Sequence, residues 1–304
     1  DVFEQELALQ FVTSNDIETM YVLFIDLDGF KTVNDTLGLK AGNHILHETG
    51  DRIKALLPTG AIVSRFSSDE FVLMVKHTNK ALITKLAGSI LHELRQPFVI
   101  DEVEVVISAS IGIAQAAVRN DSGDELIQRA DIAMTEAKYA GGNTITWFRK
   151  DMLASYNERL RLRTRIQQGL NHAEFRVHYQ PIVSTKSGQI SGFEALARWP
   201  QDDGSMISPG VFIPVAEQTG QIVELTEQIL AMVSADIPHL AAMGGEGRTY
   251  ISVNISPLCF TRGIVIELLK EIHLQAQESN VVLQVEVTES LFLDDKVTAK
   301  ATLE

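Results

Sequence analysis

The second half of the chain alternates strand-like and helix-like segments, and this alternation restricts the fold more than any other sequence feature. Strand-like runs occupy residues 177–183, 190–199, 249–255 and 281–287. Helical spacing separates the later runs, at residues 209–219, 224–242 and 264–279. Such alternation predicts α/β architecture, as a parallel sheet or a (β/α) barrel. A complete (β/α)8 barrel takes ~250 residues, so residues 151–304 are expected to form only the N-terminal part of one.

The first half mixes strands and helices less regularly, which predicts an α+β domain with helices flanking a mixed sheet. Strands are expected at residues 21–26, 103–114 and 144–148, and a hairpin over 62–75 turns at Ser67-Ser68-Asp69-Glu70. Helices are expected at residues 42–57, 80–95 and 123–140. Residues 150–173 have the pattern of an amphipathic connecting helix. We therefore predict two domains, residues 1–150 and 151–304.

Charge and cysteine content narrow the class of partner. The formal net charge of −14 argues against a nucleic-acid polymer or a broad anionic membrane surface as ligand. Cys259 is the single cysteine, which excludes an internal disulfide and fits a reducing compartment. No apolar run approaches the ~20 residues needed to span a bilayer. We expect a cytoplasmic protein, with membrane attachment only through segments outside this sequence.

Three oxygen-bearing side chains lie at or near the ends of successive predicted strands: Glu194, Asn254 and Glu286. Functional side chains of (β/α) barrels sit at this edge, and oxygen donors suit magnesium, manganese or calcium. Arg198 lies four residues beyond Glu194, on the same strand face, where it can bind a phosphate oxygen. Each residue alone has a structural explanation, such as Asn254 forming a turn before Ser256-Pro257. Together they favour a metal-assisted phosphodiester site.

The motifs of this half resemble the ordered motifs of EAL domains, the phosphodiesterases of cyclic di-GMP signalling. The matching segments are Tyr179-Gln180-Pro181-Ile182 and residues 192–199, 212–217, 252–256 and 286–289. The resemblance implies hydrolysis of cyclic di-GMP to the linear dinucleotide, with magnesium or manganese, by a homodimer.

The resemblance also implies roles for single residues. Glu194, Asn254 and Glu286 would bind the metal, Gln180 and Arg198 would contact the dinucleotide, and Glu289 would support a catalytic loop. The family's paired aspartates and catalytic lysine are expected beyond Glu304. We therefore expect the complete protein to be active and residues 1–304 alone to be inactive.

In the first half, Asp26 and Asp28 end an apolar strand two residues apart, so their side chains share one face. This spacing suits a metal–triphosphate site, and Asp69-Glu70 would add acid from a neighbouring strand. Acidic residues after a strand are otherwise ordinary turn residues. Both interpretations stay open on the spacing alone.

The order of residues here resembles GGDEF diguanylate cyclases. The matching positions are residues 26–35, Gly38, Gly42, residues 65–71, Ala130-Asp131 and Ala137-Lys138. The resemblance implies that Asp26, the Leu27 carbonyl and Asp69 hold metal. Glu70 follows Asp69 at the hairpin and is a further acidic residue of this site. The resemblance further implies that Asn34 contacts guanine, while Lys31 and Lys138 contact the phosphates of Mg-GTP.

Four departures from the cyclase pattern predict that this domain is degenerate. Ser67-Ser68 replaces the paired glycines and adds Cβ atoms where backbone must approach the nucleotide. Asn43 replaces a guanine-reading aspartate and presents one acceptor where a carboxylate presents two. Leu39 replaces a histidine, and Gly142 replaces a phosphate-side arginine. We expect no cyclic di-GMP synthesis, and a regulatory GTP-binding role stays open.

Two functional classes survive: a metal-dependent phosphodiesterase with a non-synthesising partner domain, and a cyclic di-GMP or GTP receptor or scaffold that signals through protein contacts. The retained set Glu194, Asn254, Glu286 and Glu289 favours the enzyme, because a receptor has no chemical need for all of these ligands.

Overall fold

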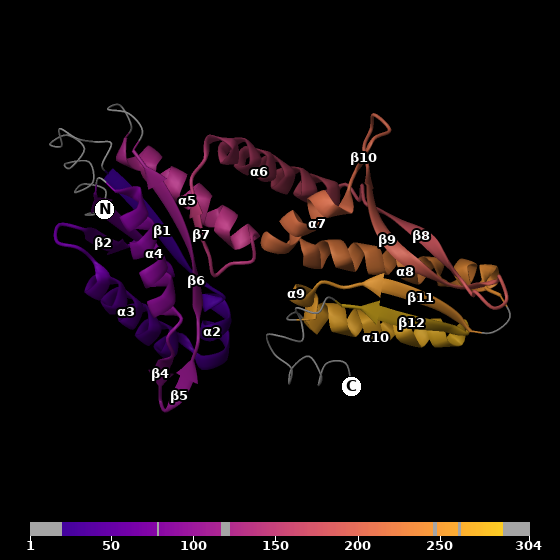
Figure 1. The fold of residues 1–304 in the computed structure, drawn as a ribbon. Coiled ribbons are helices and arrows are strands. Elements are labelled where there is room, and N and C mark those ends of the chain that lie inside the picture. The colour runs from indigo at the N-terminus through magenta and orange to yellow at the C-terminus, as the bar shows by residue number, and fades with distance from the viewer. Residues whose placement is uncertain (1–19, 78, 117–121, 246–247, 261–262, 288–304) are drawn as a thin grey trace. The chain divides into compact units, whose positions relative to one another are not determined.

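The computed structural model describes residues 20–77, 79–116, 122–245, 248–260 and 263–287 (Figure 1). The chain divides into two compact units, Asp1–Tyr156 and Asn157–Glu304. Helix α6, Lys150–Asn171, spans this division. Within the described ranges, no helix is both long enough and apolar enough to cross a membrane.

The first unit is built on a five-stranded sheet in the order β2-β3-β1-β6-β7. The strands are β1 Met20–Asp28, β2 Ile62–Arg65, β3 Glu70–Lys76, β6 Ser108–Gln115 and β7 Ile145–Trp147. The central strand β1 pairs antiparallel with β3 and β6, and β7 runs parallel to β6. Residues 20–27 are all buried because the continuous apolar run of β1 is covered on both faces. The predicted hairpin over residues 62–75 is confirmed by the β2–β3 pairing.

Helices cover both faces of this sheet. They are α2 Phe30–Leu37, α3 Leu39–Leu56, α4 Lys80–Leu94 and α5 Gly123–Tyr139. Tyr21, Leu23 and Ile25 pack in one core with residues of α3 and α4. Val22 and Phe24 alternate with them and pack against α5. Asp26 and Asp28 continue the second series, which places both on the α5 side of the sheet.

The prediction of one strand over residues 103–114 is wrong. The segment forms two strands, β5 Val103–Val105 and β6, and β5 pairs with β4 Phe98–Ile100 in a separate two-stranded sheet. The chain reverses between β4 and β5 at Asp101 and Glu102, whose φ angles are 47° and 69°. This conformation is typical of a tight hairpin turn, so β5 turns back on β4 before β6 begins.

The second unit contains the expected βα alternation. Its strands are β8 Arg176–Val183, β9 Ile190–Pro200, β10 Met206–Ile207, β11 Thr249–Asn254 and β12 Val281–Glu286. Helices α7 Pro209–Gln218 and α8 Ile222–Met243 connect β9 to β11, and α9 Pro257–Phe260 and α10 Gly263–Glu278 connect β11 to β12. Strands β9, β11 and β12 are parallel neighbours, so the predicted α/β and α+β fold class is confirmed.

The first strand of this unit lies outside the βα alternation, which the sequence predicts only for the later strands. Strand β8 pairs antiparallel with β9, with Gln180 opposite Glu194 and Arg176 opposite Arg198. Only residues 184–189 separate the two strands, and a parallel crossover needs a dozen or more residues. The short link therefore forces a hairpin.

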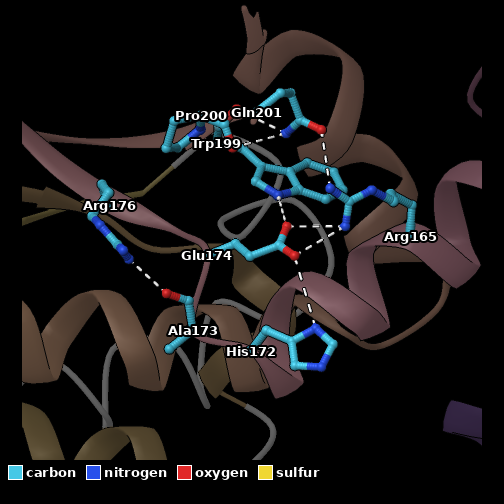
Figure 2. A network of polar contacts seen from close by, with 8 residues as sticks. All are labelled: Arg165, His172, Ala173, Glu174, Arg176, Trp199, Pro200 and Gln201. Carbon is cyan, nitrogen blue, oxygen red and sulfur yellow. Dashed lines mark hydrogen bonds and ion pairs between the residues drawn. The ribbon is translucent and has the colours of Figure 1, made fainter. Parts of the chain in front are cut away.

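A polar network ties the C-terminal part of α6 to the end of β9 (Figure 2). Nη1 of Arg165 lies 3.1 and 3.0 Å from the two Glu174 oxygens, and Trp199 Nε1 donates to Glu174 Oε2 at 3.1 Å. These two donors hold the pKa of Glu174 below its usual range, Arg165 more strongly than Trp199. Trp199 is fully buried and packs against Phe175 and Phe212, with ring centroids 4.8 and 5.7 Å away. The end of β9 is thus fixed directly next to Arg198.

Candidate functional site

The strand register of the second unit gathers polar side chains on one face of its sheet. Gln180 of β8 lies opposite Glu194 of β9, which lies opposite Ser252 of β11. Asn254 of β11 lies opposite Glu286 of β12. Residues opposite each other on paired strands share a face, and so do residues two apart along a strand. The three predicted metal ligands and Gln180 therefore lie on one face, across four strands.

Two hydrogen bonds connect this set. Asn254 Nδ2 donates to Glu194 Oε1 at 2.9 Å, and Ser252 Oγ donates to Glu286 Oε1. Ser252 is 1% exposed, whereas Asn254 and Glu286 are exposed and Glu194 is half-buried. The serine was missed by sequence reasoning, although it lies two residues before Asn254 and so shares its face. Ser252 and Asn254 orient the two carboxylates.

The donor set fits a hard divalent cation. It offers two carboxylates and the Asn254 amide oxygen, which the bond from Nδ2 leaves available, and such ligands suit magnesium, manganese or calcium. Across the described ranges, no group of three or more His, Cys, Asp or Glu side chains forms a metal cluster. Among the described residues, the candidate cation site therefore consists of two acids and one amide.

The cavity beside this face has a different character. It measures about 260 Å³ and lies among β9, β11, α7 and α8, and its lining is mostly apolar. Arg198 and Asn254 contribute to the lining, but Glu194 and Glu286 do not. The candidate site is therefore the polar sheet face rather than the cavity. Glu289, predicted to support a catalytic loop, lies outside the described residues.

In the first unit, Asp26 is the most perturbed carboxylate at the predicted nucleotide site. It is 4% exposed, its Oδ2 lies 2.6 Å from Lys138 Nζ, and its Oδ1 is buried without a hydrogen-bond partner among the described residues. Burial raises the pKa of Asp26 to about 6, against the lowering effect of Lys138. Lys138, predicted to contact phosphates, is here paired with the predicted metal ligand.

Asp28 shares the face of Asp26, as its spacing indicates, but its surroundings identify a structural residue. Its Oδ2 accepts from Ser108 Oγ at 2.7 Å and from the Asn143 backbone N–H at 2.9 Å. Its Oδ1 accepts from Ser110 Oγ at 2.7 Å. Both oxygens thus tie β1 to β6 and to the turn before β7, which favours the structural interpretation of Asp28, while its part in a metal–triphosphate site stays a prediction.

The β2–β3 hairpin brings Asp69 to the predicted site. The Leu27 N–H donates to the Asp69 carbonyl at 3.3 Å, and Ser68 Oγ donates to Asp69 Oδ1. Neither Ser67 nor Ser68 has a positive φ angle, so the turn does not use the conformation that paired glycines permit. Glu70 is half-buried, and burial followed by repulsion from Asp131 raises its pKa.

The predicted guanine and phosphate contacts lie on α2 and α3. Asn34 lies against Gly42, where an added Cβ would come within 1.9 Å of Asn34 Oδ1. Gly42 is therefore needed for Asn34 to keep this position. Asn43 and Lys31 are both exposed.

The raised pKa of Asp26 predicts a pH-dependent stability. The folded-state value of about 6 exceeds the unfolded value of ~3.9. The folded state therefore binds more protons between these values, and stability falls as the pH rises through this window. We expect Asp26→Asn to stabilise the metal-free protein by about 1–3 kcal/mol at pH 7.5 and to have little effect at pH 4.

Urea unfolding with a chelator at pH 4, 5, 6 and 7.5 measures this difference. Asp35→Asn, at an exposed carboxylate of α2, is the matched control and should change stability little at every pH. A gain for Asp26→Asn that is the same at every pH would contradict the burial of a charged group as its cause.

Comparisons with known proteins agree with the division of the chain. The family described as "Diguanylate cyclase, GGDEF domain" matches residues 1–144, and the EAL domain family matches residues 163–304. The "Bifunctional diguanylate cyclase/cyclic di-GMP phosphodiesterase MucR" of Pseudomonas aeruginosa is 36% identical over 98% of this chain and 43% of its own length. The "Cyclic di-GMP phosphodiesterase PdeR" of Escherichia coli is 29% identical over 99% of this chain and 45% of its own length. The chain spans less than half of either relative.

Among solved structures, a Vibrio cholerae LapD fragment, described as S helix-GGDEF-EAL bound to c-di-GMP, has a similar fold. Its TM-score is 0.57 at 16% identity, over 99% of this chain and 70% of that chain. At this identity the likeness concerns the fold alone.

Proposed function

Because this chain belongs to the tandem GGDEF–EAL proteins of cyclic di-GMP signalling, we propose that its EAL domain, within the complete protein, hydrolyses cyclic di-GMP to the linear dinucleotide. The GGDEF domain is proposed to be a non-synthesising regulator. Phosphodiesterase names among the relatives support the first statement.

The observation that carries the proposal is the shared face of Glu194, Asn254 and Glu286, with each carboxylate held by a hydrogen bond from β11. A magnesium or manganese ion bound there would neutralise phosphate oxygens and activate water. Around it, Asn254 orients Glu194 and Ser252 orients Glu286. Arg198 would bind a phosphate oxygen, and Gln180 would contact the dinucleotide from β8.

Turnover by the purified complete protein tests this proposal. Cyclic di-GMP is incubated with magnesium or manganese, and the linear dinucleotide is quantified by chromatography. We expect metal-dependent product that a chelator abolishes. Binding of cyclic di-GMP without any turnover would instead support the receptor or scaffold.

The GGDEF domain is expected to make no cyclic di-GMP from Mg-GTP. Lys138 is paired with Asp26, Ser68 with Asp69, and the hairpin serines have no positive φ angle. The assay is best run in a Glu194→Ala background, so that product is not hydrolysed, beside an active cyclase as positive control. Product above the no-enzyme level would show that Ser67, Ser68 and Asn43 do not disable the site.

A regulatory role for this domain requires that it still bind GTP through Asp26 and Asp69. A titration of the complete protein with GTP and magnesium should show saturable binding that Asp69→Ala weakens. Absence of measurable affinity would remove GTP from the regulatory proposal and leave hydrolysis by the EAL domain unaffected.

A further inference from the structure

The β8–β9 register places two arginines directly opposite each other, Arg176 and Arg198. Side chains in such a cross-strand pair share a face, and like charges at this spacing repel. In the described part of the chain, the hydrogen bonds of both guanidiniums go to backbone carbonyls, and no carboxylate pairs with either one. The guanidiniums of Arg176 and Arg198 thus lie near the C-terminal end of β9 without a carboxylate of the described residues to neutralise their charge.

The contacts of the pair leave most of its donors unused. Arg176 Nη1 donates to the carbonyls of Ala173 and Phe175 at 2.6 and 2.7 Å, and Figure 2 shows the first of these bonds. Arg198 Nη1 donates to the Ala197 carbonyl at 2.9 Å. Each guanidinium has five N–H donors, so further N–H groups of both remain for a ligand. By contrast, Arg165 and Arg52 bind the carboxylates of Glu174 and Glu48.

Arg176 also lies on the face of the candidate site. Along β8, Arg176, His178 and Gln180 are exposed, while Val177 and Tyr179 are half-buried between them. This alternation puts Arg176 on the same face as Gln180, which lies opposite Glu194. The arginine pair therefore borders the face that carries the acidic ligand set.

We propose that Arg176 is a second phosphate-binding arginine, which together with Arg198 holds a phosphodiester of the cyclic dinucleotide. An anion between the two guanidiniums converts their repulsion into two charge-assisted hydrogen-bonded contacts, one from each strand. This inference rests on the proposed function, because it names a further binding residue for the same substrate. Arg176 binds the ligand and takes no part in the chemistry.

Calorimetric titration of the complete protein with cyclic di-GMP, in the presence of a chelator, measures this contribution. Arg176→Gln is expected to weaken binding about tenfold, the loss of one hydrogen bond to a charged group. Arg176→Lys should lose less, because it keeps the charge. Arg161→Ala removes an exposed arginine of α6 and should leave affinity unchanged. In turnover, Arg176→Gln should raise KM with little change in kcat.

The outcomes separate this inference from the proposed function. Binding of Arg176→Gln within twofold of the unchanged protein, while Arg198→Ala binds weakly, would overturn the role of Arg176 and leave the function standing. Absence of binding and turnover in the unchanged protein would overturn the function first. Since Arg176 also bonds two carbonyls, thermal unfolding is compared without ligand. If Arg176→Gln is unstable, Arg176→Ala replaces it in the titration. A stable Arg176→Ala protein with unchanged affinity for cyclic di-GMP would equally overturn the role of Arg176.

Discussion

Glu194→Ala in the complete protein should reduce cyclic di-GMP hydrolysis by about 10³-fold, because the substitution removes one of two carboxylates from the cation-binding set. The loss of a bound metal removes several kcal/mol of transition-state stabilisation, and 1.36 kcal/mol corresponds to a factor of ten. The substitution also frees the Asn254 amide, which donates to Glu194 at 2.9 Å. Asn254 then loses the partner that fixes its orientation.

Initial rates and manganese affinity, measured on the same preparations, test this result. Glu267→Ala is the matched control, since Glu267 is an exposed carboxylate of α10 that pairs with Lys270. It should keep both the activity and the manganese affinity of the unchanged protein. Equal activity in Glu194→Ala and the unchanged protein would refute the metal role of Glu194.

The second large effect concerns folding. Gly112→Ala should destabilise the first unit by about 3 kcal/mol or more, the range of severe overpacking. A Cβ on Gly112 would lie 2.0 Å from the Ala130 carbonyl oxygen and 2.1 Å from the Met134 nitrogen. These are backbone atoms of α5, which cannot rotate away as a side chain could. Helix α5 must therefore separate from β6 to accept a single methyl group.

Denaturant unfolding, followed on the transition of the first unit, measures this cost. Gly88→Ala is the control: Gly88 lies in α4, and a Cβ there would meet no atom of the described residues within 4 Å. Alanine should stabilise that helix by up to about 1 kcal/mol relative to glycine. A small effect of Gly112→Ala would mean that α5 and β6 can adjust their spacing at low cost.

Much of the fold follows from apolar periodicity. The buried run of β1, the β2–β3 hairpin and the βα order of the second unit are all visible in the sequence. The β4–β5 hairpin is not, because its turn uses Asp101 and Glu102 at positive φ without a glycine or asparagine to indicate it. The direction of β8 also cannot be predicted from the two-residue repeat of its side chains, because this repeat identifies a strand but not the strand that pairs with it. Only the length of the link over residues 184–189 could have indicated it.

The candidate sites show the same limit. Spacing places Glu194 and Arg198 on one face, because a strand repeats every two residues. Positions at or near the ends of successive strands group Asn254 and Glu286 with Glu194, and the register agrees. Spacing does not reveal partners that are distant in sequence. Asp28 has the same spacing argument as Asp26, yet its oxygens are bound by serines 80 and 82 residues away. The pairing of Lys138 with Asp26 likewise depends on how α5 lies on the sheet.

The reversed direction of β8 has a consequence for signalling. Because β8 is antiparallel to β9, its first residue, Arg176, lies beside the C-terminal end of β9 and not at the opposite end of the sheet. Helix α6 ends at Asn171, and Arg176 follows within five residues. Helix α6 also reaches the end of β9, because Arg165 bonds Glu174 and Gln201. A rotation of α6 would therefore move the guanidinium of Arg176, proposed to bind phosphate, together with the end of β9. Under the proposed function, such a movement would change the affinity for the dinucleotide while Asn254 and Glu286, which lie on β11 and β12, keep their positions.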